Sequence, residues 1–103
     1  MKKPESVPKL TLTPMAREDL KGIGRYTQST WGIAQRNTYL NAIATTFANI
    51  TNGILYERPR NDIKSGVLSC PCNKHIIFFR RDADGDVQVL RILHSRMEFT
   101  QHF

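Results

Sequence analysis

The side chains that could carry out chemistry in this chain are a histidine and a set of cations. Cleavage of an RNA strand through its 2′-hydroxyl needs a base, an acid and cationic groups around the phosphate. His94 could be the base, with Arg80, Arg91, Arg96 and Lys64 around the phosphate. No tuned acid–base pair is evident in the sequence. We therefore favour a hydrogen-bonded histidine at a strand end, with the arginines paired to Asp or Glu, over a catalytic centre.

Two cysteines, Cys70 and Cys72, flank Pro71. Zinc sites usually space their thiols about two to four residues apart and need two further ligands. The only close companion here is His75. We therefore interpret the pair as reduced thiols near a turn rather than as a zinc site, and we expect no metal and no cofactor.

The length and charge of the chain set its class. A chain of 103 residues suffices for one domain, residues 1–103, with one modest core; residues 1–8, interrupted by prolines, should be flexible. No apolar run approaches a membrane span, and the N-terminus lacks the apolar stretch of a secretory signal, so we expect a cytoplasmic protein. The net charge of +6 suits nucleic acid, an anionic membrane or an acidic protein as partner.

Two β-prone runs, Ile76–Phe79 and Val87–Leu93, are joined by a segment containing Asp84-Gly85, which predicts a β-hairpin. A two- or four-residue loop would pair odd positions with even ones, whereas a three-residue loop would reshuffle the faces. With a loop of two or four residues, one face of the hairpin would carry His75, Ile77, Phe79, Leu90, Ile92 and His94. The other face would carry Ile76, Phe78, Arg80, Val89, Arg91 and Leu93. Each face is mostly apolar, so both should be covered.

The first half of the chain has the pattern of a strand followed by two helices. Lys9–Thr13 alternates like a strand, and Thr13-Pro14 is typical of a helix start. The first helix should end at Trp31-Gly32, and the second should run over Ile33–Thr51 and stop at Asn52-Gly53. Because so few residues separate the helices, they should form an antiparallel hairpin. Phe47 should lie on the buried face of the second helix with Tyr39 flanking that face, and we interpret aromatic residues at this spacing as core rather than as a ligand site.

Between the helices and the β-hairpin, Ile54–Gly66 should be irregular and Gly66–Cys70 an edge strand, because Pro71 cannot donate to a ladder. Pro71–Asn73 would then form a turn, and the residues after His94 a helical turn or a loose tail. The element order predicts an α+β domain with an N-terminal strand and an antiparallel helical hairpin packed on a small, mainly antiparallel sheet. The sheet face away from the helices should be partly uncovered and open to a partner.

A set of residues spread along the chain forms one recognisable pattern: Asp19-Leu20, Tyr26-Thr27, Trp31-Gly32, Gln35, Tyr39, Asp62–Gly66, His75–Arg80, Asp84-Gly85 and Arg91–Met97. With this pattern, the chain from Leu10 onward closely resembles the ParE toxins of the ParE/RelE superfamily of bacterial toxin–antitoxin systems. The chain departs from the family pattern at Ser69–Asn73, where members more often have an uninterrupted strand and a turn that contains glycine.

The resemblance implies a toxin that inhibits DNA gyrase by binding and is neutralised by an acidic, partly disordered antitoxin, in a toxin–antitoxin hetero-oligomer. Neither membrane binding nor direct nucleic-acid binding is expected. Arg80 and Arg91 are candidates for the antitoxin's acidic side chains, with intramolecular pairing as the alternative. The target-binding candidates are His94, Arg96, Met97 and Phe99.

Two other functions remain open. Related RelE-like toxins are ribosome-dependent endoribonucleases, which would make His94 and the four cations catalytic. A degenerate toxin that only binds its antitoxin and helps it to repress their promoter is the third possibility. Growth arrest on expression without the antitoxin separates this last function from the first two.

Overall fold

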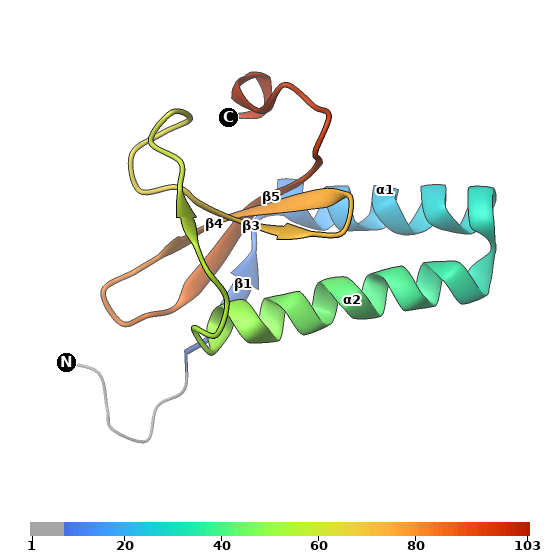
Figure 1. Cartoon of the computed structure of the whole chain (residues 1–103), viewed down its shortest axis with the longest axis horizontal. Coiled ribbons are helices and arrows are strands. Elements are labelled where there is room, and N and C mark those ends of the chain that lie inside the picture. Colours follow the sequence, from blue (N-terminus) through green and yellow to red (C-terminus); the bar gives the residue numbers. More distant parts are fainter. Residues whose placement is uncertain (1–7) are drawn as a thin grey trace.

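The computed structural model describes residues 8–103, so the flexibility predicted for residues 1–8 lies outside the described residues except at Pro8. A helical hairpin packs on one face of a five-stranded sheet with strand order β1-β5-β4-β3-β2 (Figure 1). The elements are β1 (Leu10–Leu12), α1 (Pro14–Trp31), α2 (Ile33–Thr51), β2 (Arg58–Pro59), β3 (Leu68–Cys72), β4 (His75–Arg81), β5 (Val87–His94) and the 3₁₀ turn η1 (Phe99–His102). The predicted α+β architecture is confirmed, with β1 parallel to β5 and the other pairs antiparallel.

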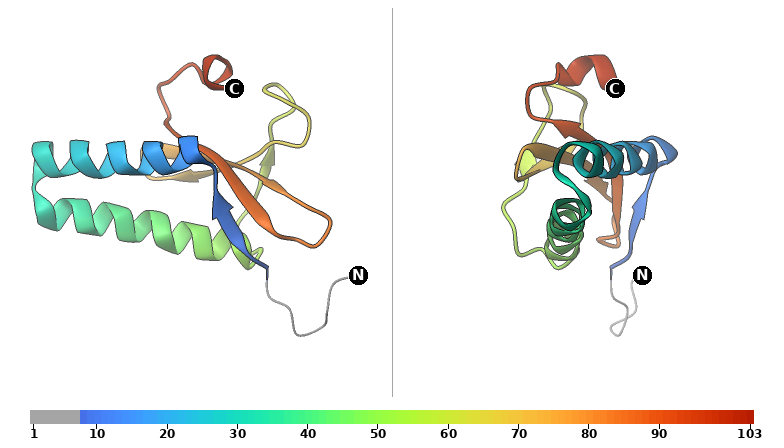
Figure 2. Two further views of the ribbon diagram at one scale, coloured as in Figure 1. Left: turned by 180° about the vertical axis from the view of Figure 1, so that it is seen from behind. Right: turned by 90° about the vertical axis from the view of Figure 1, so that its right-hand side faces the viewer.

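Both helix boundaries follow from capping chemistry. The Thr13 hydroxyl accepts a hydrogen bond from the backbone N–H of Ala16 at 3.1 Å, and Pro14 occupies the first helical position. Gly32, at a φ of +94°, separates α1 from α2, a conformation that favours glycine. Figure 2 shows that this connection lies at the far end of the hairpin, beyond the sheet. The predicted helix ends are confirmed.

The register of β4 and β5 agrees with the prediction at one end only. His75 pairs with His94, and Phe78 pairs with Arg91, but the register then shifts, so that Phe79 pairs with Val89. The assignment of Leu90 to the face of Phe79 was therefore wrong, and so was the assignment of Val89 to the face of Phe78. The reason is a loop longer than expected, Asp82–Asp86, whose odd number of residues is compensated by a β-bulge at Leu90.

The third strand also differs from its prediction. It continues through Pro71 to Cys72, and the turn into β4 is Asn73-Lys74, with Asn73 at a φ of +53°. Pro71 is tolerated because β2 pairs only with Leu68 and Ser69. Beyond that point β3 has no outer neighbour, so the missing N–H of Pro71 costs no ladder bond on that side.

The sheet face away from the helices is covered in its centre by the chain itself, so the expectation of an open apolar face was wrong there. Phe78 is fully buried, and the rings of Phe99 and Phe103 lie 5.0 and 5.2 Å from its ring. The guanidinium of Arg60 stacks on Phe78 and Phe99. Ile76 and Leu90 at the margins of this face stay partly exposed, and Phe103, which lies over Phe78, is 44% exposed.

β5 extends past the end of β1, and residues at the start of α1 form hydrogen bonds with this next part of β5. Thr13 donates its N–H to the carbonyl of Val89 and its hydroxyl to that of Leu90. The Asp19 carboxylate accepts the backbone N–H of Ile92 at 3.0 Å and two hydrogen bonds from the Arg91 guanidinium at 2.8 Å. Backbone groups of a strand edge that would otherwise lack partners are therefore satisfied by α1.

We predict that Asp19→Ala destabilises the protein by about 3 kcal/mol. The side chains of Asp19 and Arg91 are only 14% and 13% exposed, and removing one partner leaves a buried, unpaired charge. Urea denaturation measures the loss. The control is Glu18→Ala, because the Glu18–Lys21 pair is exposed and should change stability by less than about 0.5 kcal/mol. Equal effects of the two substitutions would contradict the role assigned to Asp19.

Candidate functional site: a groove between the helical hairpin and the sheet

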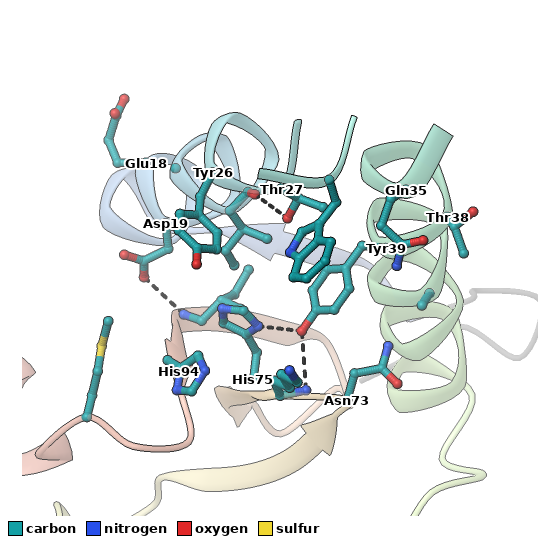
Figure 3. A pocket seen from close by; sticks show the side chains of 17 residues that line it. Glu18, Asp19, Tyr26, Thr27, Gln35, Thr38, Tyr39, Asn73, His75 and His94 are labelled. Carbon is teal, nitrogen blue, oxygen red and sulfur yellow. Dashed lines mark hydrogen bonds between the residues drawn. The ribbon is translucent and has the colours of Figure 1, made fainter. Parts of the chain in front are cut away.

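A groove runs between the two helices and the end of the sheet where β4 begins and β5 ends (Figure 3). One wall comes from α1, the other from α2, and the floor from the sheet. Its lining includes Ile23, Tyr26 and Trp31 of α1, Gln35, Tyr39 and Ala42 of α2, and Lys74, His75, Ile92, His94 and Met97 of the sheet end and its flanking turns. The groove is thus apolar and aromatic along the helices and basic at the sheet end.

Large side chains on the outer half of the groove are exposed. Tyr26 is 66% exposed and Trp31 is 68% exposed, with Ile33 beside them across the connection. They are exposed because this half of the hairpin extends beyond the sheet (Figure 1). A cluster of exposed aromatic side chains next to a groove is typical of a protein-binding surface.

Tyr39 joins the helical hairpin to the β3–β4 turn. Its hydroxyl oxygen accepts the backbone N–H of Lys74 at 3.2 Å and lies 2.5 Å from Nδ1 of His75. Because the oxygen already accepts from Lys74, its own proton is free to be donated to His75 Nδ1. Neutral His75 would then carry its proton on Nε2, the tautomer that this hydrogen bond selects.

His75 and His94 face each other across β4 and β5, with ring centroids 5.4 Å apart. Burial lowers the pKa of His75 below its ordinary value of 6.5, and the nearby His94 lowers it further. Nδ1 of His94 accepts the backbone N–H of Arg96 at 3.1 Å. This agrees with the interpretation of His94 as a hydrogen-bonded histidine at a strand end.

The basic residues singled out from the sequence are not brought together. Arg91 is paired with Asp19 and also donates to the His102 carbonyl. This is the pairing within the chain that was weighed against a role of Arg91 in antitoxin binding. Arg80 lies five residues along β4 from His75, roughly 16 Å away at about 3.3 Å per residue. Lys64 is exposed in the loop before β3, and Arg96 is exposed after β5. No shared phosphate could contact all four cations and His94.

The other target-binding candidates are also divided. Met97 lines the groove and is 45% exposed, whereas Phe99 packs on Phe78 in the core of the opposite sheet face. Cys70 and Cys72 are free, buried thiols in the core under the helices. Burial raises the pKa of the Cys70 thiol. Within residues 8–103, no group of three or more potential ligands could hold a metal ion.

Sequence reasoning missed the outer half of the groove and the role of Tyr39. Neither Tyr26 nor Trp31 was predicted to form part of a binding surface, and both are exposed. Helix length was the available signal: α1 has 18 residues and therefore spans about 27 Å, more than a short strand pair can cover. No helix among the described residues is long and apolar enough to cross a membrane.

Two solved structures share this fold. The chain is similar to a chain of the chromosomal ParDE toxin–antitoxin system of P. aeruginosa, with a TM-score of 0.72, 20% identity and coverage of 85% of this chain and 96% of the other. It is also similar to a chain of the toxin–antitoxin complex RelBE2 of Mycobacterium tuberculosis, with a TM-score of 0.64, 18% identity and coverage of 86% and 99%. At these identities the likeness concerns the fold.

Sequence comparison then gives the family. Residues 10–99 match the family described as the ParE toxin of the type II toxin–antitoxin system parDE, so the chain belongs to the ParE toxins. It is 31% identical to Toxin ParE of Escherichia coli over 84% of each chain. It is 26% identical to Toxin ParE1 of Caulobacter vibrioides, over 88% of this chain and 93% of that one.

We predict that replacing His94 raises the pKa of His75 partway toward its ordinary value. His94→Gln removes the nearby imidazole, the second cause of the lowered pKa, and leaves burial, the first cause, in place. NMR titration of the imidazole protons measures the change. His102→Gln is the control, because His102 does not line the groove. An unchanged His75 pKa in His94→Gln would show that the two rings do not interact.

Proposed function

We propose that this ParE-family chain is a toxin that inhibits DNA gyrase by binding, in the bacterial cytoplasm, and that a cognate antitoxin neutralises it by occupying the groove. The observation that supports this proposal best is the groove itself. It offers exposed aromatic side chains, which a protein partner needs for contact. Among residues 8–103 it does not bring together the base, acid and phosphate-binding cations that a reaction centre would need.

The antitoxin is proposed as the occupant on grounds of shape and charge. The groove is long, open and apolar along the helices, which suits an amphipathic segment laid between them and the sheet. The toxin carries a net charge of +6, which favours an acidic partner. Of the two arginines proposed to bind antitoxin, Arg91 already pairs with Asp19, and Arg80 does not line the groove, so an antitoxin would contact Arg80 only if it extended beyond the groove.

The proposed target-binding residues lie at the sheet end of the same groove. His94 and Met97 line it, and Arg96 follows His94 on the exposed surface. An antitoxin in the groove would therefore cover residues that gyrase is proposed to contact. Neutralisation would then follow from occlusion. Phe99 would take part only indirectly, since its ring supports the opposite face of the sheet.

A ribosome-dependent endoribonuclease of the RelE type is the alternative. The observation that favours it is the cluster of Tyr39, His75 and His94 in an open groove. This function predicts message cleavage on translating ribosomes, abolished by His94→Ala. We expect no cleavage, because the cations predicted to hold the phosphate are dispersed. Cleavage lost in His94→Ala and kept in His102→Ala would establish the alternative instead.

Purified gyrase provides the direct test of the proposed target. We expect the toxin to inhibit supercoiling of relaxed plasmid, or to accumulate cleaved DNA complexes, and we expect prior addition of the antitoxin to prevent both effects. Agarose gels that resolve relaxed, supercoiled and linear plasmid measure all three species. Unchanged supercoiling with no cleaved DNA, from a toxin that stops bacterial growth, would contradict gyrase as the target.

The proposed antitoxin site predicts that Trp31→Ala weakens antitoxin binding about thirtyfold, or about 2 kcal/mol, as for an aromatic side chain that the partner buries. Isothermal titration calorimetry measures the affinity. Tyr56→Ala is the matched control, because Tyr56 is 79% exposed and lies outside the groove. It should leave the affinity within about twofold. Equal affinities for both variants would place the antitoxin elsewhere.

A further inference from the structure

We propose that His75, His94 and Lys74 form a carboxylate-binding point at the sheet end of the groove, and that an acidic side chain of the bound antitoxin occupies it with uptake of a proton. This inference rests on the proposed antitoxin site and adds to it the chemistry of one contact and a dependence on pH. Three observations support it: the charges around the pair, the free ring nitrogens, and the environment of His75.

The charges around the histidine pair leave a cationic surplus. On α1, the Asp19 carboxylate is already bound by Arg91 and by the N–H of Ile92, and Glu18 lies exposed at the rim with Lys21 as partner. On α2, the facing group is the neutral Tyr39. The turn before β4 contributes Lys74, and the segment after β5 contributes Arg96. An anionic partner is therefore favoured at this end.

The two rings have hydrogen-bond donors to offer. Each Nδ1 is engaged, that of His75 with Tyr39 and that of His94 with the N–H of Arg96. Nε2 of neutral His94 therefore carries its proton, Nε2 of His75 carries one when the ring is protonated, and neither atom has a hydrogen-bond partner among residues 8–103. No buried side-chain nitrogen in this range lacks a partner, so both Nε2 atoms are accessible to solvent. The ring centroids lie 5.4 Å apart, and Lys74 directly precedes His75, so we propose that one carboxylate can accept hydrogen bonds from this group of donors.

Binding of a carboxylate should add a proton to His75. In the free toxin, burial and His94 hold the pKa of His75 below 6.5. A carboxylate against Nε2 favours the charged ring, so the pKa rises in the complex. Binding then takes up a proton at pH values between the pKa of His75 in the free toxin and its higher pKa in the complex. The affinity of the toxin for the antitoxin falls as pH rises through this range. The Tyr39 hydrogen bond survives protonation, because the hydroxyl oxygen can accept from Nδ1–H.

Calorimetry of the wild-type toxin with its cognate antitoxin tests the inference. The titration is run at about pH 6 and about pH 8, each in two buffers that differ in ionisation enthalpy, so that proton uptake appears as a buffer-dependent heat. We expect affinity several-fold higher at the lower pH, with about tenfold as the upper limit for each unit by which binding raises the pKa of His75. We expect His75→Asn to remove most of the pH dependence and of the proton uptake.

The third histidine supplies the matched control. His102→Asn should keep the pH dependence of the wild type, because His102 does not line the groove. His94→Asn should reduce it, and this second variant keeps the test informative if His75→Asn folds poorly. Equal pH dependence in wild type, His75→Asn and His94→Asn would overturn the inference. If Trp31→Ala still weakens binding in that case, the groove remains the antitoxin site, whereas loss of both effects would overturn the site as well.

Discussion

The ion pair between Asp19 and Arg91 is the contact on which the geometry of this toxin depends. β1 covers only the first part of β5, from Val87 to Val89. The next part of that strand edge is satisfied by Thr13 and Asp19 at the start of α1. Because a polar strand edge must find partners, this requirement fixes where α1 begins its path along the sheet. The position of the whole helical hairpin follows from that point.

A hairpin fixed at its base and longer than the sheet extends past it, and the groove results from this extension. The inner half of the hairpin packs through Ile23, Ile43 and Ile50 on the sheet. The outer half has no sheet beneath it and exposes Tyr26 and Trp31. Tyr39 lies between the two halves and is held by the turn before β4. The same fold therefore produces a packed core at one end and, at the other, the surface proposed to bind the antitoxin.

The helices and the order of the elements could be predicted because their signals are local. Thr13-Pro14, Gly32 and Asn52-Gly53 each specify a boundary by capping or backbone conformation. The sheet was harder, because its details depend on neighbours distant in sequence. The bulge at Leu90 compensates a loop of odd length, and Pro71 is tolerated only because β2 is short. The burial of Phe78 depends on Phe99 and Phe103 returning to it, which no local pattern indicates.

The candidate site was predicted in part, for a related reason. His94 and Met97 were singled out and line the groove, but their partners on the helices were not predicted to form part of a binding surface. An amphipathic pattern identifies the apolar face of a helix, and it does not state how far the underlying sheet extends. Arg91 shows the converse: its type suggested a binding role, and only the fold reveals the carboxylate that engages it.

The central claim is that the groove acts by binding a protein, and Trp31 can report this directly because it is the only tryptophan in the chain. Its fluorescence can be followed while a tryptophan-free antitoxin is added, with acrylamide as a quencher. The free toxin should show long-wavelength emission that is readily quenched, since the side chain is 68% exposed. In the complex the emission should shift to shorter wavelength and quenching should fall several-fold. Emission and quenching that stay unchanged in a fully formed complex would contradict the account.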